Sequence, residues 1–291
     1  MRFLFVLFSP FLVLPTSACI NGYARVPGVI VVEEEDHALG GIEINSEELA
    51  AYIKERTHAC AKKLGHSCND LVIAHLYAKH WKEAVELSTK LVALYPNEYN
   101  VVITHAAALE LNGRTAEAIP VMEWALELNP TSHKRSEWIH LNLLKQRLLG
   151  ESGVDPSALI GVELHRGDSL VAPDTLDLNA LLAQLHYQIT DRHYFTPEHD
   201  PLFGALLFAY ADVLRLTNYR STSARFYTMA KEYGFDREAR LAQFHASKTT
   251  GDSIDAQTAR AVAKEQAEAA PVAKRRSWPL FGGAAMAVIL L

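Results

Sequence analysis

The chain has 291 residues, of which 49% are hydrophobic, and its formal net charge is -6. This is the composition of an ordinary globular protein, with room for one large domain or two small ones. The mild acidity argues against binding of nucleic acid, which usually requires a basic face.

The first 18 residues have the pattern of a secretory signal peptide. Arg2 supplies a basic start, residues 3–14 form an apolar run, and residues 16–18 are small, as a signal peptidase requires. An uncleaved N-terminal anchor is the alternative interpretation of this pattern. Residues 1–18 therefore predict export to the cell envelope, either to the periplasm or to an outer face.

Cys19 follows the predicted cleavage site directly. Residues 14–19 resemble the lipoprotein box of bacteria, although Thr16 stands where that box has leucine. The resemblance implies lipidation of Cys19, which would hold the exported chain on a membrane. The alternative is that Cys19 is incidental and lies beside an ordinary cleavage site.

Two cysteines remain after export, Cys60 and Cys68. In an oxidising compartment these residues, eight positions apart, can form a disulfide at the corner between two helices. The alternative is a metal site that also uses His66, but two thiols and one imidazole leave a tetrahedral ion short of a ligand. The sequence therefore favours a Cys60–Cys68 disulfide.

Helices dominate the predicted secondary structure. Residues 19–45 are expected to be irregular, with a β-branched run at 29–32 that is consistent with a lone strand or an extended segment. Helices are predicted where apolar residues recur at spacings of three and four, and prolines or glycines end them. The predicted helices cover residues 46–64, 69–79, 82–95, 99–111, 115–128, 132–149, 176–190, 202–216, 221–233 and 237–248.

Two stretches of the chain match each other at a spacing of 34 residues. Residues 81–96 recur as 115–130, with alanine at Ala84 and Ala118 and a proline closing each stretch. A period of 34 residues is that of the tetratricopeptide repeat family, and residues 65–130 resemble that family. In that register the two alanines allow the helices of one unit to approach closely.

The resemblance implies an all-α fold: a right-handed α-helical repeat, or tetratricopeptide-like solenoid, with additional flanking helices. The repeat part is expected to span residues 46–149. A second helical region is expected at residues 150–248, where the hairpin of 202–216 and 221–233 is a degenerate copy of the same unit. At least three units are expected in a stable stack, so the two clear units must pack against flanking helices.

The family binds its ligands in the concave groove lined by the first helix of each unit. By this resemblance the groove is expected to bind a protein or peptide partner, and its apolar lining suits an apolar or amphipathic peptide. The residues implied for this groove are Asn69, Ile73, Tyr77, Asn100, Ile103, Ala107, Glu110, Glu137, Leu141 and Lys145.

The C-terminal part of the chain predicts a second means of membrane association. Residues 249–277 are rich in alanine, glutamine, lysine and glutamate and are expected to form a tether. Residues 278–291 form an uncharged hydrophobic tail, shorter than the ~20 residues of a spanning helix. A tail anchor, a sorting signal that is later removed and a peripheral tail are all consistent with this segment.

Chemistry-bearing motifs are weak in this sequence. His186, His193 and His199 cluster with Asp200, but their spacings match no metal motif, and neither a phosphate-binding loop nor a nucleophile elbow occurs. The favoured function is therefore a non-catalytic protein–protein interaction scaffold of the cell envelope, without cofactor or metal. The alternative is an envelope enzyme or metal-binding protein with its site in the loops at 150–200, where His193, His199 and Asp168 would converge.

Overall fold

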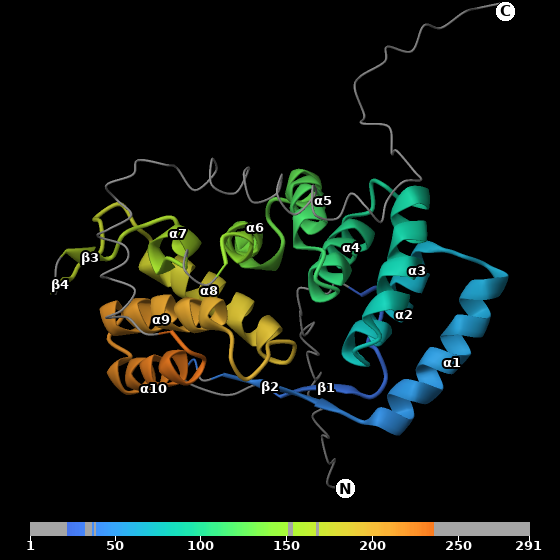
Figure 1. Cartoon of the computed structure of the whole chain (residues 1–291), viewed down its shortest axis with the longest axis horizontal. Helices are drawn as coiled ribbons and strands as arrows, with labels where there is room; N and C mark the ends of the chain where they lie inside the picture. The colour runs from blue at the N-terminus through green and yellow to red at the C-terminus, as the bar shows by residue number, and fades with distance from the viewer. Residues whose placement is uncertain (1–21, 33–36, 38, 151–153, 167–168, 236–291) are drawn as a thin grey trace, which may run out of the picture.

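The computed structural model describes residues 22–32, 37, 39–150, 154–166 and 169–235. The predicted signal peptide, Cys19, the helix at 237–248, the tether and the hydrophobic tail lie outside these residues. The described chain is predominantly helical, and its few strands are short (Figure 1). Within the described ranges, no helix combines the length and the apolar character needed to cross a membrane.

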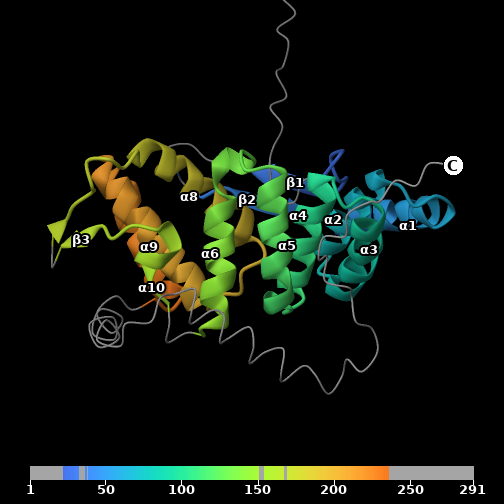
Figure 2. The same ribbon diagram turned by 90° about the horizontal axis from the view of Figure 1, so that it is seen from above.

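The first half of the molecule is a series of helices that pack in chain order. Each helix contacts the next from α1 to α6, and the short 3-10 helices η1 and η2 precede α2 and α6. Figure 2 shows α2 to α6 side by side in one row, with α1 beyond the end of that row. Their bounds are α1 Ser46–Lys62, η1 His66–Cys68, α2 Asn69–Tyr77, α3 Trp81–Leu94, α4 Tyr99–Leu111, α5 Thr115–Leu128, the 3-10 helix η2 His133–Arg135, and α6 Glu137–Leu148.

Local signals set most of these boundaries. The side chain of Asn45 caps α1 by accepting the backbone N–H of Glu48. At the corner between α4 and α5, Gly113 has a φ of 75°, a left-handed conformation that glycine adopts without strain. Ala84 of α3 and Ala118 of α5 are fully buried, so these helices pack closely against their neighbours, as the alanine positions predicted.

The second half is built around one almost wholly buried helix, α9 Pro201–Leu216. α10 returns along α9, and its close approach depends on Gly204, where an added Cβ would lie 2.8 Å from the carbonyl oxygen of Ala230. The other elements of this half are α7 Pro156–Ile160, β3 His165–Arg166, β4 Ser169–Leu170, α8 Leu178–His193 and α10 Arg220–Glu232. α7 and the small hairpin of β3 and β4 were not predicted from the sequence.

The apolar core consists of two clusters that meet at α6. One contains the buried faces of α2 to α5 and Leu144 of α6, whereas the other contains Ile139 and Leu143 of α6 with the core of α7 to α10. α6 therefore turns different faces to the two halves. It joins the predicted repeat part to the second helical region.

An antiparallel hairpin near the N-terminus also connects the two halves. β1 Val29–Val32 pairs with β2 Gly41–Ile44, in the register Val29 opposite Ile44. The expectation of an irregular segment at 19–45 with a lone strand is wrong here, because Gly41–Ile44 supplies the partner strand. Val29 packs in the first core cluster and Leu39 in the second. Tyr210 of α9 also donates a hydrogen bond to the carbonyl of His37, at 3.1 Å.

The structure contains the disulfide that the spacing predicts, between Cys60 and Cys68. It joins the end of α1 to the 3-10 helix before α2, with the two Cα atoms 5.9 Å apart. His66, the third residue of the alternative metal site, packs its ring against Tyr23 and Tyr95.

Candidate functional site

The residues predicted to line an open groove are mostly inaccessible. Asn69 and Ile103 are fully buried, Ile73 is 3% exposed, and Tyr77 and Glu137 are 5% and 1% exposed. Asn100 and Glu110 are half-buried. The expectation that these positions line a groove accessible to a partner is therefore wrong for most of them, because other parts of the same chain cover this face. Two of the predicted positions, Ala107 and Glu110, line a cleft that is described below.

The N-terminal segment covers the beginning of α2 and α4. The backbone N–H of Tyr23 donates to the carboxylate of Asp70 at 2.6 Å, and the Tyr23 hydroxyl donates to Glu98 at 3.2 Å. Beneath them, the side-chain amide of Asn69 donates to the carbonyl of Asn100 and to Thr104. Asn69 therefore ties α2 to α4 and is not presented to a ligand.

The segment after α8 covers the end of α2 and the start of α3. The hydroxyl of Tyr194 donates to the backbone carbonyl of Tyr77 at 2.9 Å. The ring of Phe195 lies 5.3 Å from that of Tyr77 and 6.3 Å from that of Trp81, between ring centroids. The positions expected to receive a partner thus hold two aromatic side chains of the protein itself.

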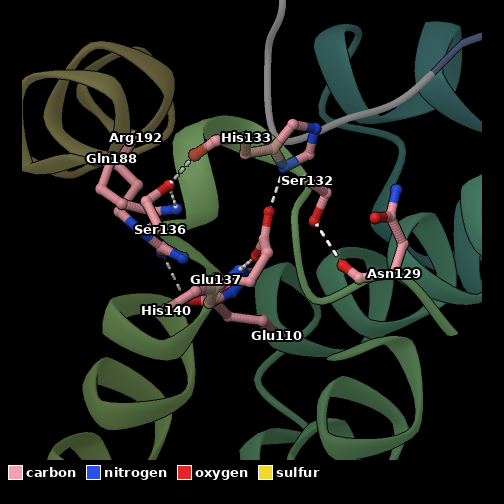
Figure 3. A network of polar contacts seen from close by, with 9 residues as sticks. All are labelled: Glu110, Asn129, Ser132, His133, Ser136, Glu137, His140, Gln188 and Arg192. Carbon is pink, nitrogen blue, oxygen red and sulfur yellow. Dashed lines mark hydrogen bonds and ion pairs between the residues drawn. The ribbon is translucent and has the colours of Figure 1, made fainter. Parts of the chain in front are cut away.

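A buried network of charged side chains, drawn in Figure 3, joins the end of α4 to the start of α6. His140 of α6 is hydrogen-bonded through Nε2 to Glu110 of α4, at 2.6 Å, and through Nδ1 to Glu137, at 3.3 Å. Glu137 is also bonded to His133 in the preceding 3-10 helix. His140 therefore lies between two carboxylates from different helices.

Helix α8 attaches to this network from the second half of the molecule. Arg192 donates to Glu110 at 2.9 Å, and the side-chain amide of Gln188 donates to the hydroxyl of Ser136 at 2.9 Å (Figure 3). Tyr187, one residue earlier, stacks its ring on His133, with 4.9 Å between the centroids. These contacts fix the orientation of α8 against α4 and α6.

The electrostatics of the network favour charged carboxylates and a charged histidine. Burial acts to raise the pKa of Glu110, but Arg192 and His140 hold it well below its usual range. Burial also opposes ionisation of Glu137, yet hydrogen bonds from His133 and His140 lower its pKa to about 2. Burial and Arg192 act to lower the pKa of His140, but Glu110 and Glu137 outweigh them and raise it.

The backbone that delivers His133 to this network is unusual. His133, Lys134 and Arg135 all have left-handed φ values, of 48°, 60° and 63°. Non-glycine residues adopt this region only when surrounding contacts hold them there. This turn explains why α6 begins at Glu137, whereas the sequence predicted one continuous helix from 132.

A cleft opens beside the network and remains accessible from outside. It is formed by the end of α4, one face of α6 and the connection between α8 and α9, and has a volume of about 250 Å³. Apolar side chains and charged groups share its wall. The side chains that matter for a ligand are Ala107, Leu111, Phe195 and Pro197 on the apolar part, and Arg147 and Arg192 among the charged groups.

The cations of this cleft are matched by nearby carboxylates. Arg147 donates to Asp200 at 2.8 Å while 42% of its side chain stays exposed, and Arg192 is paired with Glu110. Asp200 also accepts the first N–H groups of α9, so it positions the end of the connection. Glu110 was predicted from the sequence, but Arg147 and Arg192 were not, because they lie 53 and 82 positions from their partners Asp200 and Glu110.

The histidines of the alternative enzyme or metal hypothesis occupy separate environments. His186 is hydrogen-bonded to the hydroxyl of Tyr210, at 2.9 Å, whereas His193 stacks on Phe203. Burial lowers the pKa of both histidines. Asp168 lies outside the described residues. Among the residues that the structure describes, no group of three or more histidine, cysteine, aspartate or glutamate side chains is placed to hold a metal ion.

A second histidine–carboxylate pair was not found from the sequence. Nε2 of His165 lies 2.7 Å from the carboxylate of Asp212, which also accepts the hydroxyl of Tyr227 at 2.6 Å. Burial and, to a smaller extent, the hydrogen bond to Asp212 raise the pKa of the Tyr227 hydroxyl. These contacts join β3, α9 and α10, so the pair has an evident role in packing.

Comparisons with known protein families, with curated proteins and with solved structures found no match to this chain.

Proposed function

We propose that this protein is a non-catalytic interaction scaffold of the cell envelope that binds a protein or peptide partner. Its binding site is the cleft between α4, α6 and the α8–α9 connection. The observation that carries this proposal is the cleft itself, because it is open and lies on three helices held by the buried charge network. Preformed sites of this kind bind with less loss of conformational freedom.

The helical framework supports a tetratricopeptide-like scaffold. α2 and α3 form one antiparallel pair, α4 and α5 form the next, and α2 also contacts α4. Ala84 and Ala118 occupy equivalent, fully buried positions in the second helix of each pair. We propose that α6 stands where the first helix of a third unit would stand, and that α7 to α10 take the place of further units.

The lining of the cleft indicates the kind of partner. Its apolar part suits aliphatic or aromatic side chains, whereas its balanced charges suit the polar groups of a peptide backbone. An amphipathic peptide satisfies both. Two of the positions implied by the repeat resemblance, Ala107 and Glu110, also line this cleft.

A bulky side chain in the cleft tests this proposal. Thr196 is half-buried and lines the cleft, and its hydroxyl donates to the carbonyl of Arg192. Thr228 is exposed on α10, and its hydroxyl likewise donates to a carbonyl four residues earlier. Thr196→Trp and Thr228→Trp therefore lose the same hydrogen bond but differ in place, which makes the second a matched control.

Both variants and the unmodified protein are crosslinked in envelope fractions, and the adducts are quantified by mass spectrometry. The proposal expects one specific adduct, reduced at least about tenfold by Thr196→Trp and unchanged by Thr228→Trp, since filling a cleft removes the contacts of its ligand. Equal recovery with both variants, at unchanged thermal stability, overturns the site.

Export and membrane association rest on the terminal segments outside the described residues. We propose that residues 1–18 direct export and that a lipidated Cys19, the tail at 278–291, or both attach the protein to a membrane. Fractionation of the unmodified protein, Cys19→Ser and a chain ending at residue 277 distinguishes these attachments. Recovery of unmodified protein wholly in the cytosol, with the first 18 residues intact, contradicts this part of the proposal.

A further inference from the structure

The connection between α8 and α9 places two adjacent aromatic side chains against the end of α2 and the start of α3. Tyr194 follows α8 directly, and Phe195 follows Tyr194. Phe195 lies against Tyr77 and Trp81, and Tyr194 also packs beside Tyr77, with 5.8 Å between ring centroids. The receiving surface is thus the end of α2 and the start of α3.

The contacts of Tyr194 combine a directional hydrogen bond with a tilted ring contact and a nearby cation. Its hydroxyl donates to the carbonyl of Tyr77, and the ammonium of Lys79 lies 5.4 Å from the centre of its ring. Lys79 is held at the corner between α2 and α3 with a φ of 58°. A cation over an aromatic face and a hydroxyl on a backbone carbonyl are the contacts by which proteins recognise aromatic anchors of a peptide.

The two rings pack at the edge of the first core cluster, close to the surface. Tyr194, Phe195 and Trp81 are all half-buried, and the residues that follow Thr196, from 197 to 199, are exposed. Phe195 also lines the cleft of the proposed function, so the surface that it covers is continuous with that cleft. A partner peptide in the cleft would therefore reach the edge of the aromatic pair.

We propose that the surface formed by Tyr77, Lys79 and Trp81 is a docking site for a partner segment with two consecutive aromatic residues, and that Tyr194–Phe195 occupies it as an internal competitor. This inference rests on the proposed function as an interaction scaffold. A partner must displace the internal pair, which has an effective concentration on the order of millimolar because it is part of the same chain. The protein is thus expected to bind such partners weakly until the pair is released.

A labelled peptide tests the inference without knowledge of the natural partner. The probe has the sequence of residues 190–199 with a fluorescent label, and the control probe has alanine at both aromatic positions. Binding is measured by anisotropy to the unmodified chain and to the double variant Tyr194→Ala, Phe195→Ala. We expect the double variant to bind the aromatic probe at least about tenfold more tightly than the unmodified chain, and to bind the control probe no better.

A single substitution tests the inference even if the double variant does not fold. Phe195→Ala alone keeps the Tyr194 anchor and should give an intermediate affinity, with helical content measured by circular dichroism. Equal affinity of the unmodified chain and of a folded variant for the probe overturns the inference. If the probe binds both proteins equally but the crosslinked adduct is still lost in Thr196→Trp, the proposed function stands and only the docking surface is overturned. If the double variant binds the aromatic probe more tightly but no crosslinked adduct forms, the proposed function is overturned and the docking surface stands.

Discussion

Arg192 near the end of α8 donates to the carboxylate of Glu110 on α4 at 2.9 Å, and the two residues are 82 positions apart in the sequence. The exposed fractions of the two side chains are 15% and 10%. This pair, with His140 on the other oxygen of Glu110, attaches the second half of the molecule to the repeat helices. Arg192 also lines the cleft, so this ion pair holds one wall of the cleft in place.

Removal of Arg192 should therefore destabilise the protein. Arg192→Ala leaves Glu110 with one hydrogen-bonded cation in place of two, and loss of a hydrogen bond to a buried charge costs ~2–3 kcal/mol. Urea unfolding followed by circular dichroism measures the change in the free energy of unfolding. Arg114→Ala is the control, since Arg114 pairs with Glu117 at the surface, and such pairs contribute only ~0–1 kcal/mol. Equal effects of the two variants would contradict the assigned role of Arg192.

The histidine of the network should give a pH-dependent contribution to stability. Since the folded-state pKa of His140 is raised, its stabilising effect is complete below its unfolded pKa of 6.5 and is lost as pH rises through the folded value. The difference in unfolding free energy between the unmodified protein and His140→Gln should therefore shrink as the pH rises above 6.5. Denaturant unfolding from pH 5 to about pH 8.5, above the reference histidine pKa, measures it.

His193 supplies the control with the opposite sign. Burial lowers its folded-state pKa, so the folded protein favours neutral His193, and this stability is lost as pH falls below 6.5. His193→Gln should therefore relieve a penalty at acid pH, whereas His140→Gln should cost most there. The same slope for both variants would show that His140 is not a cation between Glu110 and Glu137.

Most of the helices could be predicted from the sequence, but the contacts by which other segments cover the predicted groove could not. Apolar periodicity, together with signals such as Gly113, placed α2 to α5 within one or two residues, because helix formation depends on local residues. The burial of Tyr77 under Tyr194 and Phe195 depends on a contact between segments 117 positions apart, which no local pattern encodes. The predicted groove positions around Tyr77 are inaccessible for this reason, because the repeat resemblance does not indicate that the chain itself supplies the side chains that cover them.

A substitution at Gly204 should show how closely α9 and α10 are packed. A Cβ on this residue would lie 2.8 Å from the carbonyl oxygen of Ala230 and 2.8 Å from Cβ of Phe235. Because a backbone carbonyl cannot move cheaply, Gly204→Ala should destabilise the protein by ~1–3 kcal/mol. Gly41→Ala in β2 is the matched control, since no atom lies within 4 Å of its added Cβ. Thermal unfolding of both variants measures the difference, and a neutral Gly204→Ala would mean that the two helices are farther apart.

Loss of the Cys60–Cys68 disulfide should destabilise the N-terminal end of the repeat part. The bridge closes a loop with a sequence separation of 8, and a crosslink of this size lowers the conformational entropy of the unfolded chain by an amount equivalent to ~2.5 kcal/mol. Cys60→Ser with Cys68→Ser should lower the free energy of unfolding by about this amount. Urea unfolding with and without reductant provides the internal control: reductant should destabilise the unmodified protein to the level of the double variant and leave that variant unchanged. A reductant-insensitive unmodified protein would show that the two thiols are not bonded in solution.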